Sequence, residues 1–202
     1  MNISIERVKK LREETGAGVV ECKKALEEAK GDTEEAKKIL RKRGVRIAQK
    51  KSGEATNQGI ITSYIHHNGN VGALVEVHCQ SDFVAKNSEF KKFAKDIAMH
   101  IVAFDPRWIS PEDIPPSVIE EEKAILRAQA EKENKPANII NRIVEGRMKK
   151  FYSEVCLLSQ PFLRDEEKTV KQHLQELIAE VGENIRIHRF VRYDLKKISE
   201  NN

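Results

Sequence analysis

The sequence predicts an α+β fold, with a three-helix module at the N-terminus, an antiparallel-sheet core packed with helices, and an inserted helical hairpin. Three observations predict it. Apolar residues recur at helical spacing through residues 1–50, and two β-branched runs flank an Asn-Gly turn within residues 59–79. Residues 117–158 show a charged helical pattern with a narrow apolar stripe, broken once by a proline.

The same patterns divide the chain into five segments. We expect a three-helix docking module at 1–50, a basic linker at 51–57, the first part of the core at 58–116, a coiled-coil hairpin at 117–158, and the C-terminal helix and closing strand of the core at 159–202. A chain of 202 residues is long enough for one large or two small domains, and it can bury a core without a metal or a disulfide.

The expected module has clear helix boundaries. Ser4 precedes the first helix, residues 15–18 (Thr-Gly-Ala-Gly) interrupt the pattern, and a second helix runs from Val19 to a stop at Gly31. Asp32 then begins a third helix as its capping residue. The adjacent valines at the start of the second helix are either half-buried core residues or part of an exposed face that binds a partner's helix.

Six of the eleven residues from Arg41 to Lys51 are basic. We interpret this run as a solvated connector to the core, with nucleic-acid or ribosome contact as the alternative. The overall composition argues against a dedicated nucleic-acid binder, because 36 basic and 32 acidic side chains leave a net charge of only +4 and aromatic residues make up 5%.

A β-hairpin is expected within residues 59–79, where the turn reads His-His-Asn-Gly-Asn. His66 and His67 lie at this turn and are candidate metal ligands by residue type. They have no carboxylate or thiol at a suitable spacing, so we interpret them as solvated turn residues.

The most informative segment follows the hairpin. Cys79 to Val84 reads Cys-Gln-Ser-Asp-Phe-Val, and it lies where a short apolar strand meets a helix. Ser81 or Asp82 can cap the first amides of that helix. Phe83 then lies on the first turn, near the surface, where it either packs into the core or is offered to a pocket in a partner.

Helices dominate the rest of the chain. A long helix over about residues 88–104 has one apolar face, formed by Phe90, Phe93, Ile97, Ile101 and Phe104. His100 lies beside this face and is interpreted as a packing residue. A final helix at 169–180 precedes residues 184–193, whose alternation of apolar and polar residues predicts a closing strand with one solvated, basic face.

The charged region between them predicts an antiparallel helical hairpin. Its two helices are expected at 118–134 and 136–158, with Pro136 at the start of the second. The apolar residues expected at the interface are Ile119, Ala124, Ile125 and Ala128, opposite Ile139, Ile140, Ile143 and Val144. Such a hairpin is either an arm for partners or a lid on the sheet.

The sequence carries no recognisable enzyme motif. It has no Gly-x-x-x-x-Gly-Lys-Ser/Thr loop, no Gly-x-Gly-x-x-Gly after a strand, no His-Glu-x-x-His and no Gly-x-Ser-x-Gly. A cysteine-dependent enzyme would need His78 to activate Cys79, but neighbours on a strand point to opposite faces. We therefore expect an interaction protein, with no catalytic residue, metal or cofactor of its own.

The cellular compartment can be inferred from the cysteines and from the N-terminal residues. The three cysteines are an odd number without paired spacing, which indicates a reducing environment. The first 15 residues are too charged for a secretory signal, and no run approaches the ~20 apolar residues of a membrane helix. We expect a soluble, cytoplasmic protein with no membrane contact.

Three separated stretches together suggest a family. They are Val8–Gly18 with Cys22–Leu26 and Gly31-Asp32; Asn57–Val77 with Cys79–Lys86; and Val144–Phe151 with Gln160–Phe162. In this order they resemble the signatures of bacterial-type translation elongation factor Ts, the guanine-nucleotide exchange factor of elongation factor Tu. The resemblance extends from Ile5 to Tyr193.

The resemblance implies a mechanism for the segment after the hairpin. The family's Thr-Asp-Phe-Val turn corresponds to Ser81, Asp82, Phe83 and Val84, and Ser81 keeps the capping hydroxyl. In the family this turn enters the G domain of elongation factor Tu near its magnesium site, disturbs metal and phosphate contacts, and releases GDP. The resemblance assigns that intrusion to Asp82 and Phe83.

It also implies further contacts. The N-terminal module is then ubiquitin-associated-like, and Leu11, Val19 and Val20 are expected to meet a helix of the partner's G domain. The later part of the core is expected to hold the third domain of elongation factor Tu.

The length resembles the short form of the family, because residues 90–103 pass directly into a stretch that belongs to the second core half of the long form. The short form works as a homodimer. We expect the closing strand from Ile185 to Val191, with its unpaired edge, to form the dimer contact. The expected partners are therefore elongation factor Tu and a second copy of this chain, with no specific nucleic acid.

Overall fold

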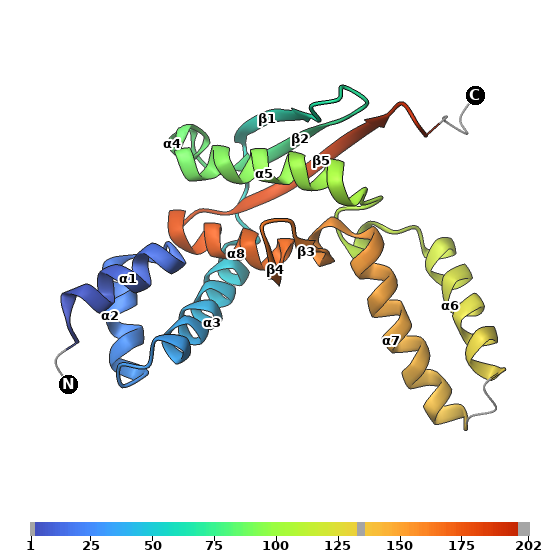
Figure 1. Ribbon diagram of the computed structural model, residues 1–202, viewed down its shortest axis with the longest axis horizontal. Helices are drawn as coiled ribbons and strands as arrows, with labels where there is room; N and C mark the ends of the chain where they lie inside the picture. The colour runs from blue at the N-terminus through green and yellow to red at the C-terminus, as the bar shows by residue number, and fades with distance from the viewer. Residues whose placement is uncertain (1–2, 133–135, 198–202) are drawn as a thin grey trace. The chain divides into compact units, whose positions relative to one another are not determined.

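The computed structural model describes residues 3–132 and 136–197, and it contains two compact units (Figure 1). The first combines residues 1–99 with residues 171–202, and the second contains residues 100–170. Helices and antiparallel strands in the same chain confirm the predicted α+β class. In the described part of the chain, no helix is both long and apolar enough to cross a lipid bilayer.

The first unit begins with three helices, α1 (Ile5–Thr15), α2 (Val19–Glu28) and α3 (Thr33–Lys51). The side chain of Ser4 caps α1, and the Asp32 carboxylate caps α3 by accepting the Glu35 N–H at 3.0 Å. Both caps are those that the sequence predicts. The helices share a small core, formed by Val8, Leu11, Cys22, Ala25, Leu26, Ala29 and Ala36.

Helix α3 is longer than expected. The basic run from Arg41 to Lys51 lies on this helix, so its interpretation as a connector is wrong. Lysine and arginine are good helix formers, and Arg43 is held by two glutamates of the module. The chain between α3 and the first strand is confined to residues 52–57.

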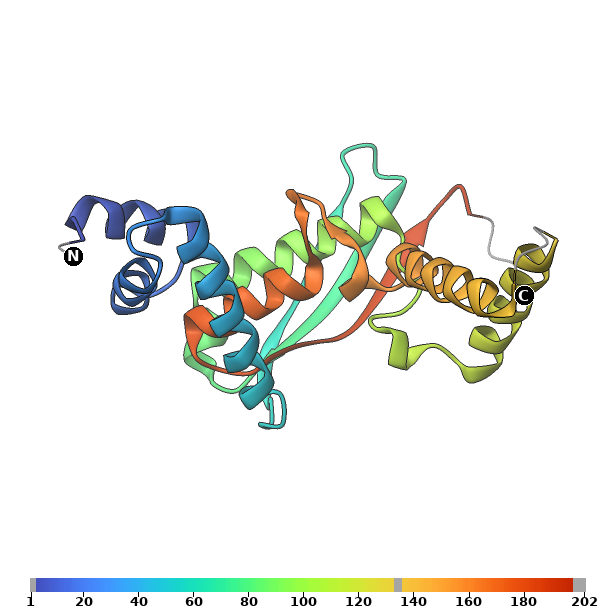
Figure 2. The same ribbon diagram turned by 90° about the horizontal axis from the view of Figure 1, so that it is seen from below.

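The core of the first unit is a three-stranded antiparallel sheet in the order β1-β2-β5. Its strands are β1 (Gln58–Ile65), β2 (Val71–Cys79) and β5 (Ile185–Asp194), and its helices are α4 (Asp82–Lys86), α5 (Ser88–Phe104) and α8 (Val170–Val181). The predicted hairpin and closing strand are confirmed. Helices α5 and α8 lie side by side (Figures 1 and 2), and the rings of Phe93 and His173 are in contact at a centroid separation of 5.2 Å.

Only one face of the sheet is buried. On β2, alternate residues from Ala73 to Cys79 are buried, whereas Leu74 between them is 45% exposed. Four of the five apolar residues predicted on one face of α5 are also buried, namely Phe90, Phe93, Ile97 and Ile101. Phe104, the fifth, is 38% exposed.

A β-bulge changes the direction of side chains along β5. The register between β2 and β5 slips at Glu76, and His188 is the extra residue on β5. Strict alternation from Ile185 would send Val191 and Tyr193 to the buried face. The bulge reverses the alternation, and both side chains lie on the outer face, 40% and 70% exposed.

The second unit contains the helical hairpin and a small two-stranded sheet. Its elements after α5 are the 3-10 helix η1 (Pro111–Asp113), α6 (Pro116–Glu131), α7 (Ala137–Val155), the 3-10 helix η2 (Leu157–Ser159), β3 (Pro161–Phe162) and β4 (Asp165–Thr169). Packing of α6 on α7 confirms the predicted antiparallel hairpin. The β3-β4 sheet has no counterpart among the sequence expectations, because its residues are mostly charged.

The hairpin interface differs from the predicted one on α6. Its buried residues are Leu126, Ala130, Val144 and Met148, with Ile119, Ile140 and Ile143 partly buried beside them. Ala124, Ile125 and Ala128 are exposed, so their assignment to the interface is wrong. Adjacent apolar residues such as Ile125 and Leu126 allow two helical stripes, and packing against α7 selects the second.

A buried polar cluster organises the second unit around His100. This side chain is 0% exposed, and its Nδ1 accepts the Leu163 N–H at 3.2 Å. Its Nε2–H therefore donates to the Gln160 side-chain oxygen at 3.0 Å. Gln160 in turn donates to the carbonyls of Glu154 and Phe104. His100 is thus a satisfied packing residue, as predicted.

Acid is expected to destabilise the protein through His100. Burial lowers the pKa of His100 from its ordinary 6.5, because a second ring proton would face the Leu163 N–H in an apolar surrounding. The unfolded chain then binds a proton that the folded chain excludes, so stability falls as pH drops through about 6.5, by at most about 1.4 kcal/mol per pH unit.

Thermal unfolding between pH 7.5 and 5.0 measures this effect. The variant His100→Gln should lose part of the pH dependence, whereas His67→Gln, in the exposed turn, should keep it. Equal pH dependence in all three proteins would contradict the role of His100.

Candidate partner-binding site

The turn between β2 and α4 presents an aromatic side chain to solvent. Ser81 caps α4 from an extended backbone conformation (φ −119°, ψ 159°), and its Oγ accepts the Val84 N–H at 3.3 Å. Val84 is 7% exposed, whereas Phe83 is 83% exposed. Of the two alternatives that the sequence left open for Phe83, its exposure excludes packing into the core. Capping and the buried Val84 hold the short helix in place while Phe83 stays outside.

Asp82 stands beside Phe83 as an exposed anion. The Lys86 ammonium lies 2.7 Å from its carboxylate, and this hydrogen bond holds the pKa of Asp82 below its usual range. The carboxylate is therefore charged at neutral pH. An exposed ion pair of this kind contributes little to stability, so a charged group of a partner can replace Lys86 at low cost.

The cysteine beside this turn is not a reactive thiol. Cys79 is buried, and its Sγ–H donates to the Ser81 carbonyl at 3.2 Å. Burial, together with the negative charge of Glu183, raises the pKa of Cys79 to about 11. His78 is engaged elsewhere, because its Nε2 lies 2.6 Å from the Glu76 carboxylate. The arrangement does not support a cysteine-dependent enzyme.

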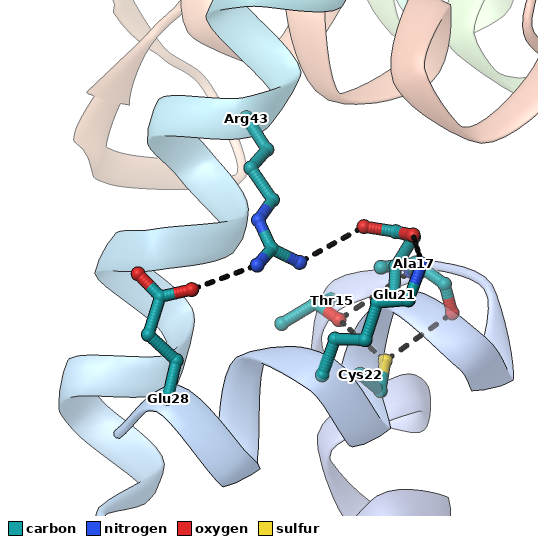
Figure 3. Close-up of polar contacts among 7 residues, drawn as sticks. Thr15, Ala17, Glu21, Cys22, Glu28 and Arg43 are labelled. Atoms are coloured by element: carbon teal, nitrogen blue, oxygen red, sulfur yellow. Dashed lines mark hydrogen bonds and ion pairs between the residues drawn. The ribbon is translucent and has the colours of Figure 1, made fainter.

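In the N-terminal module, polar contacts shape the loop before α2 (Figure 3). The Cys22 Sγ–H donates to the Ala17 carbonyl at 3.4 Å. The Thr15 hydroxyl donates to the Leu11 carbonyl at 2.7 Å. Arg43 of α3 reaches the carboxylates of Glu21 and Glu28 of α2 at 2.9 and 2.8 Å (Figure 3). These contacts fix where α2 begins and how it lies on α3.

The residues at the start of α2 form an exposed apolar pair. Val19 is 53% and Val20 is 64% exposed, which answers the question left open by the sequence in favour of a surface position. Leu11 differs, because it is 0% exposed and lies in the core of the module. It supports α2 from beneath and offers no surface to a partner.

A second apolar surface covers the outer face of the sheet. Cross-strand register places Leu74 opposite Val191, and Tyr193 opposite Gly72. On β1 the alternation sends Ile61 and Ile65 to the same face, each 68% exposed. We call these residues, Ile61, Ile65, Leu74, Val191 and Tyr193, the outer apolar face. β5 is also an edge strand of the sheet, so its outer edge makes no strand pairing among the described residues.

Comparison with known proteins agrees with the sequence signatures. A family model described as "Elongation factor TS" matches residues 2–195. The chain belongs to the elongation factor Ts family. It is similar to proteins named Elongation factor Ts from Carboxydothermus hydrogenoformans (54% identical over 193 residues, 96% of this chain and 89% of the relative), Caldanaerobacter subterraneus subsp. tengcongensis (56% over 192 residues, 95% and 96%) and Fervidobacterium nodosum (50% over 195 residues, 96% and 99%).

One contact of the turn could not be read from the signatures of the elongation factor Ts family. The carboxylate of Glu183, in the loop between α8 and β5, accepts the Ser81 N–H at 3.0 Å and the Ser81 O–H at 2.6 Å. The two residues are 102 positions apart. No local pattern around Glu183 indicates this pairing, which depends on how β5 joins the sheet.

Among the residues that the structure describes, potential metal ligands lie close together at one place. Glu76, His78 and His188 have ligand atoms within 4.8 Å of one another. Arg189 Nε already lies 2.6 Å from one Glu76 oxygen, and Arg186 lies 3.3 Å from His188 Nδ1. Hydrogen bonds from Arg189 and His78 lower the pKa of Glu76 to about 2. Guanidinium groups thus occupy the surroundings that a metal ion would need, and the cluster is an ion-pair network.

Proposed function

We propose that this chain is a guanine-nucleotide exchange factor for elongation factor Tu, acting in the cytoplasm, and that Asp82 and Phe83 promote the release of GDP. The family to which it belongs consists of exchange factors rather than enzymes. The observation that carries the proposal is the 83% exposure of Phe83 on a capped and anchored turn. A large apolar side chain held outside the core in this way is suited to a pocket in another protein.

In the proposed mechanism the turn enters the G domain of elongation factor Tu near its magnesium site. Phe83 occupies apolar space there, and the negative charge of Asp82 disturbs contacts around the metal and the phosphates. Nucleotide and magnesium both belong to the partner. This chain therefore needs no cofactor of its own, and its residues act by displacing contacts rather than by proton transfer.

The free energy available from Phe83 alone is too small for exchange, so the interface must extend beyond the turn. Burying one Phe side chain contributes about 1.5 to 3 kcal/mol, or roughly one to two powers of ten in an equilibrium. The release of a tightly bound nucleotide requires a larger free energy than that. We propose that Val19 and Val20 bind a helix of the G domain and that the later part of the core holds the third domain. By reciprocity, GDP must weaken binding of this chain to elongation factor Tu by the same factor.

We also propose that the chain acts as a homodimer. The outer apolar face has five exposed apolar side chains and lies next to the outer edge of β5. A second copy of the chain can cover a surface of this kind. This extends the expectation from the sequence, which placed the contact on Ile185–Val191 alone. The bulge at His188 adds Tyr193 to the surface.

Timed release of a fluorescent GDP analogue from elongation factor Tu tests the proposed function. Excess unlabelled GDP is added with and without the chain, and release is expected to speed up with chain concentration until it saturates. Release that stays at the spontaneous rate at every concentration would rule the function out. RNA binding that falls steeply with salt, without any effect on GDP release, would instead favour a nucleic-acid adaptor.

A further inference from the structure

Glu183 makes a two-point contact with the residue that begins the exposed turn. One carboxylate oxygen accepts the Ser81 backbone N–H at 3.0 Å, and the other accepts the Ser81 hydroxyl at 2.6 Å. Both are charge-assisted hydrogen bonds, which are stronger than those between neutral groups. Ser81 is thereby held through its backbone and its side chain at once.

The contact also orients the capping hydroxyl. A serine hydroxyl has one proton, and here Ser81 gives it to Glu183, so its lone pairs remain for the Val84 N–H at 3.3 Å. The three groups form a directed chain, from the Val84 amide through the Ser81 hydroxyl to the Glu183 carboxylate. Hydrogen bonds in such a chain strengthen one another. The backbone of Asp82 and Phe83 lies between the two fixed points.

The loop that carries Glu183 is itself held on both sides. Gly182 ends α8 in a left-handed conformation (φ +75°), and its N–H donates to the Ile178 carbonyl at 2.9 Å. Asn184 is 7% exposed, and its side-chain amide donates to the Glu54 carbonyl at 2.7 Å. The carboxylate of Glu183 therefore reaches Ser81 from a fixed base.

We propose that Glu183 is the positioning residue of the Asp82-Phe83 turn, which it holds through Ser81 in the conformation that enters elongation factor Tu. This inference rests on the proposed exchange function. The hydrogen bonds of Glu183 are to Ser81, so its effect on exchange passes through the conformation of Ser81 and not through the partner. Loss of the contact lets Phe83 sample orientations that do not fit the partner, which lowers the maximal rate of GDP release.

The variant Glu183→Gln tests the proposal because it keeps the size of the side chain and removes the charge and one acceptor oxygen. The maximal rate of GDP release is expected to fall roughly ten-fold, as expected for the loss of charge-assisted hydrogen bonds. The half-saturating concentration should change less, since Val19 and Val20 are untouched. Glu121→Gln, at an exposed position of α6, is the matched control and should leave release unchanged.

A double variant separates positioning from general support of the fold. If Glu183 acts by presenting the turn, then Glu183→Gln should cause a clearly smaller loss in the background of Phe83→Ala, where only Asp82 remains to be presented. An equal loss of exchange rate in the parent and in the Phe83→Ala background would assign Glu183 to the fold alone and overturn the proposal. The proposal would also be overturned if Glu183→Gln exchanged at the parent rate while Phe83→Ala was defective. If Phe83→Ala itself exchanges normally, the proposed role of the turn fails, and the positioning role fails with it.

Discussion

Replacing Phe83 by alanine is expected to remove most of the acceleration of GDP release from elongation factor Tu while leaving the fold intact. The side chain is 83% exposed, so its loss leaves no cavity in the core of the protein. In the complex the ring is expected to be buried, and its removal should cost about 1.5 to 3 kcal/mol of the interaction that drives exchange. The expected slowing is about ten-fold to a hundred-fold.

The measurement is the timed release of fluorescent GDP over a range of chain concentrations, with thermal unfolding as the check on folding. Ile125→Ala is the matched control, because Ile125 is also an exposed apolar residue, 47% exposed on α6. It should exchange like the parent chain. If Phe83→Ala accelerated GDP release as strongly as the parent chain, at the same melting temperature, the insertion mechanism would be ruled out.

Introducing a charge on the outer apolar face is expected to separate the proposed homodimer into monomers. Val191 pairs with Leu74 at the centre of this face, and both side chains are partly exposed in the single chain. In a dimer, the carboxylate of Val191→Asp would be buried without a partner, which costs several kcal/mol. The folded monomer should tolerate it, since the position already contacts water.

Sedimentation of the parent and variant chains at micromolar concentration measures the effect. The parent chain should sediment as a dimer and Val191→Asp as a monomer, while Ile125→Asp on the hairpin should remain dimeric. A parent chain that is monomeric throughout would disprove the dimer. A variant that stays dimeric would place the contact on another surface. If the second copy supplies a missing core half, the monomer should also exchange GDP more slowly.

Much of the fold is predictable because its signals are local. Ser4 and Asp32 begin helices by capping the amides just after them, and Asn68-Gly69 forms a turn that joins two adjacent strands. The exception among local signals is the run from Arg41 to Lys51. Its charge resembles that of a linker, but charged residues with good helix propensity continue α3 when one side packs on the module.

The candidate site is predictable in part. Ser81, Asp82 and Phe83 stand out because the strand-to-helix junction and the family signature both lie within a few residues. The sequence could not decide whether Phe83 faces the core or the solvent, since one turn of a short helix carries no periodicity. It also could not show that Leu11 is buried while Val19 is exposed, because both are apolar residues at helical spacing.

By itself, the sequence determined the α+β class, the family, and the identity of the turn, all of which depend on neighbouring residues. Only the tertiary structure decided the outer apolar face and the contact between Glu183 and Ser81. Two of the five side chains of this face, Val191 and Tyr193, lie there because a single extra residue, His188, reverses the alternation of β5. The contact joins residues 102 positions apart, and their distance depends on how the last strand enters the sheet. Packing, which no local pattern encodes, sets both.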